Sequence, residues 1–234
     1  MSRYLYEKLL VKPYPKKQYM DKESILWLEN HLDVCVTMKD VKNRFYELSI
    51  GKFPIDKLDF NSEIYKKNNC FGIHGIRHQF RVSLYIWILI QYYNIELEFS
   101  NIVQLLQAAL YHDILRKNDN TDANHGKKSA LWIKSKYNFI DYKIIDAISN
   151  HDVIIKDYTI YDILVKSGDA LDRYRLPKEN WWVKKEYLLM NIDDEIFEIC
   201  KFITLFIEKQ TYEINDADKL IEEIILCTKE INLI

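Results

Sequence analysis

The amino-acid sequence predicts an all-α protein. Only five glycines and four prolines occur among 234 residues, so few positions favour a break in helical structure. Apolar residues also recur at i, i+3 and i+4 along almost the whole chain, which is the spacing of one face of a helix. With 48% hydrophobic residues, a chain of this length can bury a core of its own, and we expect one domain spanning residues 1–234.

The expected helices follow one another with short connections. Residues 21–50 form the first helical region, and the polar stretch 52–69, which contains Pro54, leads to the centre of the chain. Ser100 is expected to cap the second central helix, and Pro177 is expected to end the fifth. The last two helices of the chain are amphipathic, and we expect them to cover the core without contributing chemistry. The expected central and C-terminal helices are residues 74–93, 100–116, 125–137, 141–155, 161–176, 195–211 and 216–231.

The charge balance limits the classes of molecule that the protein is expected to bind. A net charge of -2, from 33 basic and 35 acidic residues, provides no chain-wide basic field for a nucleic-acid backbone or an anionic membrane. We therefore expect a small-molecule partner, with no nucleic acid and no membrane, and the oligomeric state stays open.

The four cysteines form no CxxC pair, which argues against a zinc knuckle or a disulfide framework and suits reduced thiols. The longest apolar run, residues 84–90, is far shorter than the roughly 20 residues of a membrane span, and the N-terminus lacks signal-peptide features, so a cytoplasmic protein is expected.

Histidines gather in the middle of the chain, and two of them fall on apolar helical faces. His112 and Asp113 continue the stripe that begins at Ile102, and His151 lies on a similar apolar stripe. A buried carboxylate is costly unless a positive group compensates it. Two partners for Asp113 are open: Arg116, in an ion pair beside a core histidine, or a divalent metal ion with ligands from several helices. The presence of several inward histidines favours the metal.

Three short motifs in this region resemble those of the HD-domain metal-dependent phosphohydrolases. They are HGIRHQFRV at residues 74–82, YHD at 111–113 and GDALDRYRL at 168–176. The resemblance covers residues 70–180 and implies an HD-type helical bundle in which a first histidine, an adjacent His-Asp pair and a distant aspartate hold a metal ion. The implied ligands are His78, His112, Asp113 and Asp169, with His125 and His151 as further ligands where two ions bind.

Three details of the resemblance stay open. His125 follows the His-Asp pair closely, so a role in substrate binding or acid catalysis stands beside the ligand role. His74 is expected at the start of its helix without binding the metal. Ser167 and Gly168 stand where the last motif often carries another acidic residue, which leaves the hydrogen bonding around Asp169 undetermined.

The implied donor set has nitrogen and oxygen atoms and no thiolate, which suits one or two ions of Mn, Fe, Co, Ni or Zn. Such an ion acidifies bound water and polarises a phosphoryl oxygen, and Asp113 is the expected catalytic carboxylate because it would bridge two ions. Lys128 and Arg173 are expected to contact the substrate phosphate. Arg81 is expected to pair with a motif carboxylate behind the ligands, and Asp172 either supports a ligand or pairs with a nearby arginine.

The resemblance implies a metal-dependent phosphohydrolase that acts on a nucleotide or another small phosphate ester. Two other interpretations stay open: an oxygenase in which two iron ions activate dioxygen, and an HD protein that binds nucleotides without catalysis. A nuclease is less favoured because the sequence shows no basic groove. The 17 tyrosines and five tryptophans are expected in the core rather than stacked on bases.

Overall fold

A computed structural model describes residues 22–31, 37–68, 71–117, 122, 124–176, 182–185 and 188–231. The helix end expected at Pro177 and the thiols of Cys35 and Cys70 lie outside these ranges. Cys200 and Cys227 lie inside them, and both are buried free thiols.

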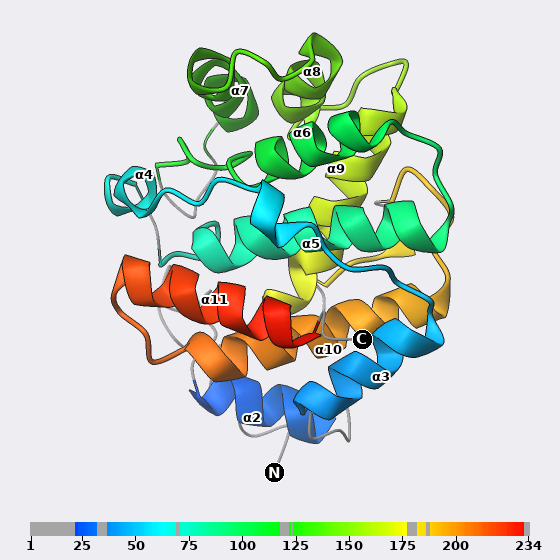
Figure 1. Cartoon of the computed structure of the whole chain (residues 1–234), viewed down its shortest axis with the longest axis vertical. Coiled ribbons are helices and arrows are strands. Elements are labelled where there is room, and N and C mark those ends of the chain that lie inside the picture. The colour runs from blue at the N-terminus through cyan, green and yellow to red at the C-terminus, as the bar shows by residue number, and fades with distance from the viewer. Residues whose placement is uncertain are drawn as a thin grey trace.

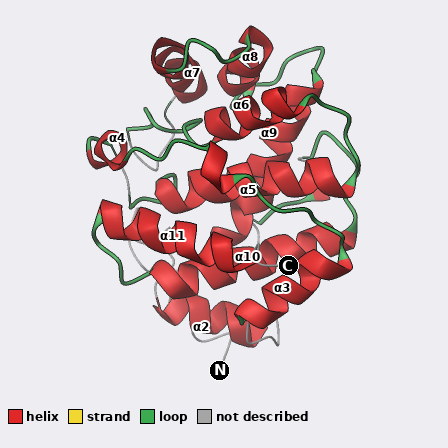
Figure 2. Ribbon diagram, in the orientation of Figure 1, coloured by secondary structure: helices red, strands yellow, loops and turns green. Residues whose placement is uncertain are grey.

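The all-α prediction is confirmed, because every regular element of the described ranges is an α-helix or a 3-10 helix (Figure 2). None of these helices combines the length and the apolar character that crossing a membrane requires. The elements are α2 (Lys22–His31), α3 (Met38–Glu47), η2 (Ile55–Lys57), α4 (Ser62–Lys66), α5 (Ile76–Tyr92), α6 (Phe99–Ala109), α7 (His125–Lys136), α8 (Tyr142–Asn150), α9 (Ile160–Leu171), η3 (Asp172–Arg175), α10 (Asp194–Thr211) and α11 (Ala217–Ile231).

Helix α5 is the central element of the fold. All of residues 78–90 are buried, so the helix is covered on every side, and residues 84–90 are apolar around the whole circumference, as such burial requires. It packs against α6 and α9 on one side and against α10 on the other. In Figure 1, α6, α7 and α8 lie above α5, α9 runs from that group down past α5, and α2, α3, α10 and α11 lie below it. The first polar residues of α5 therefore lie between the two groups of helices.

The two C-terminal helices cover the lower face of α5, as the sequence predicts. Tyr85 of α5 donates a hydrogen bond to the carbonyl oxygen of Cys200 in α10 at 2.9 Å, and its hydroxyl also lies 2.7 Å from that of Thr204. Helix α11 packs on α10 and α3. Helix α10 therefore forms hydrogen bonds with α5 in addition to its apolar packing, and a further polar contact between these helices supports the site described below.

Several helix ends differ from the sequence-based expectation. Helix α6 begins after Glu98, so Ser100 lies in the first turn and is not the N-cap. The helix ends at Ala109 rather than near residue 116, and turns with i to i+3 hydrogen bonds continue the chain through Tyr111 and His112. Periodicity extended the predicted helix too far because the turn residues are also buried.

The polar connection 52–69 also contains more structure than expected. The 3-10 helix η2 and the short helix α4 form within it, and Asn61 caps α4 by accepting a hydrogen bond from the backbone N–H of Glu63 at 3.0 Å. Further along, α8 ends at Asn150, and His151 is its C-cap. The helix expected over residues 141–155 is therefore shorter at its C-terminal end.

Candidate metal centre

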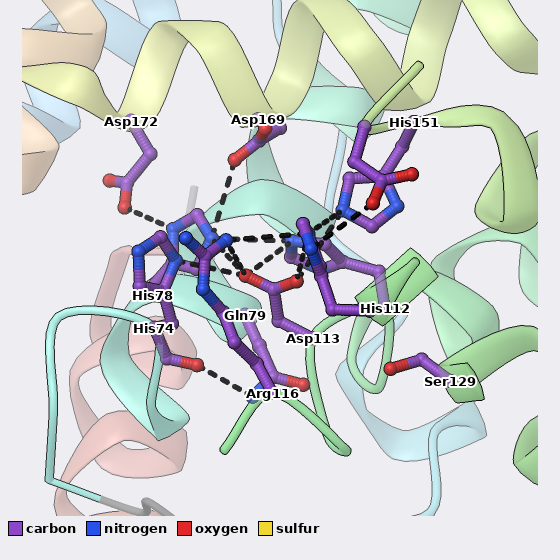
Figure 3. Close-up of polar contacts among 12 residues, drawn as sticks. His74, His78, Gln79, His112, Asp113, Arg116, Ser129, His151, Asp169 and Asp172 are labelled. Atoms are coloured by element: carbon purple, nitrogen blue, oxygen red, sulfur yellow. Dashed lines mark hydrogen bonds and ion pairs between the residues drawn. The ribbon is translucent and has the colours of Figure 1, made fainter. Parts of the chain in front are cut away.

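The four ligands implied by the strongest motifs converge on one region (Figure 3). His78 lies in the first turn of α5, His112 and Asp113 lie in the turns after α6, and Asp169 lies near the end of α9. His78 Nε2 is 3.2 Å from His112 Nε2, 3.3 Å from Asp169 Oδ1 and 3.7 Å from Asp113 Oδ2. Donor atoms from three separate segments thus surround a common point.

The two further histidines lie on the other side of Asp113. Oδ1 of Asp113 is 3.1 Å from His125 Nε2 and 3.4 Å from His151 Nε2, and these two nitrogens are 3.1 Å apart. The carboxylate of Asp113 therefore faces one histidine group through Oδ2 and another through Oδ1. Three sets of donors have ligand atoms within 4.8 Å of one another: His74, His78 and Asp113; His78, His112 and Asp169; and His112, Asp113 and His151.

The hydrogen bonds of the outer ring nitrogens indicate which nitrogen of each histidine carries the proton. Nδ1 of His112, His125 and His151 lies 2.7–2.8 Å from the backbone carbonyl oxygen three residues earlier, and Nδ1 of His78 lies 2.7 Å from Asp172 Oδ2. Because those partners accept hydrogen bonds, each Nδ1 is the donor. A neutral imidazole has one N–H, so Nε2 of each ring presents a lone pair whenever that ring is neutral.

The centre of the cluster is therefore rich in electron pairs and poor in donors. Two lone-pair nitrogens at 3.2 Å, as in His78 and His112, do not form a hydrogen bond with each other unless one ring is protonated. Oδ1 of Asp113 is buried and has no hydrogen-bond partner among the described residues. A cation at the centre would satisfy these atoms, so the donor set fits one or two divalent ions with mixed nitrogen and oxygen ligands.

The charge states agree with this arrangement. Burial lowers the pKa of His112 to about 3, which keeps the ring neutral and its lone pair available. Burial works against the charge on Asp113, but the surrounding histidines, His112 first, hold the pKa of its carboxyl well below the usual range. Burial also opposes protonation of His78, but its three aspartate neighbours outweigh burial and raise its pKa to about 9. A proton on His78 stands in for part of the positive charge that a metal ion would supply.

A buried ionic network fixes the orientation of His78. Asp172 accepts a hydrogen bond from Arg81 Nε at 2.5 Å and a second from Arg81 Nη2 at 3.2 Å. Nη1 of Arg81 donates to Glu208 Oε1 in α10 at 2.6 Å. Asp172 Oδ2 also lies 3.4 Å from Nη1 of Arg175, so this aspartate contacts both the candidate ligand His78 and a nearby arginine.

Sequence reasoning missed Glu208, because the segment that contains it was expected only to cover the core. A sequence signal does exist. Cys200, Thr204, Glu208 and Thr211 follow one another at i+4 and i+3 spacing, and all four are buried. A polar line on the inward side of an amphipathic helix indicates a buried polar partner.

Two more residues enter the site that sequence reasoning left out or placed elsewhere. His74 was expected to play no ligand role, but its Nδ1 lies 2.9 Å from Asp113 Oδ2 and the ring is mostly buried. Asp152 follows His151 directly, and its Oδ2 lies 3.1 Å from His125 Nδ1. Arg116 Nη1 is 3.5 Å from Asp113 Oδ2, so the ion pair proposed as the alternative to a metal exists beside the histidine cluster.

The start of α7 is shaped to bring His125 to the centre. Asn124, the residue before the helix, has φ of 62°, a left-handed conformation that asparagine tolerates better than most residues. Gly126 follows His125, and a Cβ atom at this position would lie 2.8 Å from both the His151 ring and the carbonyl oxygen of Ile148. The glycine therefore permits α7 to approach the end of α8 closely.

A cavity of about 390 Å³ opens onto the cluster. Three arginines, Arg116, Arg173 and Arg175, line it beside histidine and aspartate side chains of the centre. Lys128, expected to contact phosphate with Arg173, does not line this cavity. Its ammonium group pairs instead with Asp122 at 2.8 Å.

Comparison with known proteins gives one partial similarity. Ribonuclease Y from Malacoplasma penetrans (strain HF-2) is 33% identical over 99 residues, which is 42% of this chain and 20% of the ribonuclease. The chain thus matches about a fifth of that relative's length. No protein-family model and no solved structure matches the chain.

Proposed function

We propose that this protein is a divalent-metal-dependent phosphohydrolase of the HD-domain type. The observation that carries the proposal is the convergence of histidine lone pairs and aspartate carboxylates from separate segments, with the outer nitrogens of the rings held by fixed hydrogen-bond acceptors. Mn, Fe, Co, Ni and Zn suit this donor set. When bound, such an ion supplies hydroxide near neutral pH and neutralises charge that develops on a phosphoryl oxygen.

The chain's own residues have distinct roles in this proposal. His78, His112 and Asp169 hold one side of the centre, and His125 and His151 hold the other. Asp113 approaches the histidines of both sides, so its carboxylate would help to hold an ion on either side. His74 is a further candidate ligand because it approaches the same Asp113 oxygen that faces His78.

The cavity beside the centre supports an anionic substrate. Its volume of about 390 Å³ lies in the range of small-molecule sites. The guanidinium groups of Arg116, Arg173 and Arg175 line it, and arginine forks match phosphate geometry. A nucleotide or another phosphate ester therefore fits the chemistry, and the partial similarity to a ribonuclease adds the phosphodiester bond of RNA to the candidates.

The test is metal analysis of the purified protein, followed by hydrolysis assays with each candidate metal on phosphate esters, nucleotides and bis(p-nitrophenyl) phosphate. We expect bound metal and turnover that both disappear in Asp113→Asn. Asp146→Asn, on the exposed face of α8, is the matched control and should behave as the wild type. Absence of hydrolysis under every metal contradicts the proposal, and oxygen uptake by an iron-loaded protein would support the oxygenase interpretation instead.

A further inference from the structure

A second cavity, of about 450 Å³, lies between α4 and the C-terminal half of α7. Both helices lie on the same side of the molecule in Figure 1. Asn61 and Lys67 line the cavity from the α4 side, and Trp132, Lys136 and Tyr137 line it from the α7 side. We call this cavity the α4–α7 groove. It shares no lining residue with the cavity at the metal centre.

The groove contains a fixed and partly exposed aromatic ring. Trp132 makes edge-to-face contacts with Tyr111 and Tyr137, with ring centroids 5.4 and 6.4 Å apart. These contacts hold the indole in place. The indole N–H groups of Trp87 and Trp182 each donate to a backbone carbonyl oxygen at 2.8 Å, but that of Trp132 has no acceptor within the described ranges. Trp132 thus offers an aromatic surface and an unused donor.

The carboxylates of the groove have partners within the protein, whereas its lysines form no ion pair with described residues. Asp59 accepts a hydrogen bond from the Tyr137 hydroxyl at 2.9 Å, and Glu63 is paired with Lys66 at 2.8 Å. Lys67 and Lys136, in contrast, form no ion pair with any described carboxylate. The positive charges of the groove are therefore available to a ligand, whereas its negative charges already have partners.

Helix α7 connects this groove to the metal centre. The helix carries four lysines and no acidic residue, so its local charge is positive although the whole chain is near neutral. His125 begins the helix, and Trp132 follows seven residues later, about 10 Å along the axis. A basic surface with an aromatic platform is the usual combination in proteins that bind single-stranded nucleic acid.

We propose that the α4–α7 groove binds an unpaired base of a single-stranded oligonucleotide, with Trp132 as the stacking platform and Lys67 and Lys136 as phosphate contacts. This inference rests on the proposed function and deepens it, since the phosphodiester to be hydrolysed would lie at the metal centre and a neighbouring nucleotide in the groove. The sequence-based expectations, that no nucleic acid binds and that the aromatic residues lie in the core, came from the net charge and the aromatic content of the whole chain. The groove instead concentrates free lysines and one tryptophan at a single place.

The inference can be tested by binding alone. Fluorescence anisotropy with fluorescein-labelled hexauridylate, and with the matching single-stranded DNA, is measured in excess chelator so that no hydrolysis occurs. We expect the wild type to bind, Trp132→Ala and Lys136→Gln each to weaken binding at least about tenfold, and Trp132→Phe to retain most of the affinity because it keeps the stacking face. Lys219→Gln, an exposed lysine of α11, is the charge-matched control and should bind as the wild type.

Hydrolysis of bis(p-nitrophenyl) phosphate separates this inference from the proposed function. Trp132→Ala and Lys136→Gln should hydrolyse this small diester at the wild-type rate, because neither residue touches the metal centre. If the wild type hydrolyses the diester but does not bind the oligonucleotide, or binds it as tightly in both groove variants, the inference is overturned and the proposed function stands. If binding depends on Trp132 and no diester is hydrolysed, the groove stands and the proposed function fails. Circular dichroism checks that Trp132→Ala folds, and Lys136→Gln gives an independent answer if it does not.

Discussion

The two sides of the candidate metal centre are held by different means. On the α5 side, His78 is fixed by Asp172, which is itself held by the Arg81 fork, and Arg81 also binds Glu208 in α10. On the α7–α8 side, the outer nitrogens of His125 and His151 are held by backbone carbonyl oxygens. The α5 network is closed to solvent, whereas both α7–α8 histidines line the open cavity.

This difference indicates that one side of the centre is rigid without a metal and the other depends on the metal more strongly. A buried network of charges with every partner in place resists distortion, because breaking any pair leaves an uncompensated buried charge. His125 and His151 are held at helix ends by backbone carbonyl oxygens, with Asp152 as a second partner of His125, and such rings have less to prevent local opening. We therefore expect the metal to be anchored by the α5 side and to order the α7–α8 side when it binds.

The largest effects should come from removing one histidine on each side. His78→Ala removes the anchored ligand and should abolish metal binding and lower kcat by about 10³-fold or more. His125→Ala should retain one bound ion and keep part of the activity. Metal content and kcat of the two variants are compared in parallel. Equal losses in both would show that the two sides are not functionally distinct.

The supporting network should affect stability and metal affinity together. Asp172→Asn leaves Arg81 with an incomplete set of charged partners, so we expect the free energy of unfolding to fall by about 3 kcal/mol and metal affinity to fall 10- to 100-fold. Glu208→Gln should change both quantities in the same direction by less, because Glu208 touches no proposed ligand. Urea denaturation and metal titration measure the two quantities.

The control for these variants is Glu198→Gln, which removes a half-exposed partner of Lys201 on the same helix as Glu208. Surface pairs contribute about 0–1 kcal/mol, so this change should be almost silent. If Asp172→Asn is as mild as Glu198→Gln, the network does not support the site.

Chelation should distinguish the two sides in a single experiment. After metal removal, backbone amides in the first turn of α7 and around His151 should exchange hydrogen at least about tenfold faster, whereas amides of residues 78–90 should be unaffected. Hydrogen exchange read by mass spectrometry resolves these segments. Uniform loss of protection in α5 as well would mean that the metal supports the whole core rather than the α7–α8 side.

The sequence predicts those features of the structure that depend on neighbouring residues better than those that depend on contacts between distant residues. Helices such as α10 and α11 were predicted because their apolar period runs through contiguous residues. The end of α6 was not, because the turn that carries His112 and Asp113 is as buried as the helix before it. The apolar period shows which residues are buried. Here the helical hydrogen-bond pattern ends at Ala109, but burial continues beyond it.

The site shows the same division between local and distant information. His112 and Asp113 were selected because an imidazole and a carboxylate continue an apolar stripe, which is a local anomaly. The bond between Arg81 and Glu208 joins residues 127 positions apart, and no local pattern near either residue identifies the other. Asp152 was passed over and His74 was placed outside the ligand set for a similar reason, since their closeness to His125 and Asp113 arises from packing of separate segments.

The smallest expected effect concerns the two cations chosen from sequence as phosphate contacts. Arg173 lines the cavity at the metal centre, so Arg173→Ala should raise KM about tenfold through loss of a charge-assisted hydrogen bond to the substrate. Lys128 is partly exposed and paired with Asp122, so Lys128→Ala should change KM less than about twofold. Steady-state kinetics of both variants on the same substrate make the comparison. A large effect at Lys128 and none at Arg173 would mean that the substrate enters over the α7 side of the centre, and that the side we describe as dependent on the metal also recognises the phosphate.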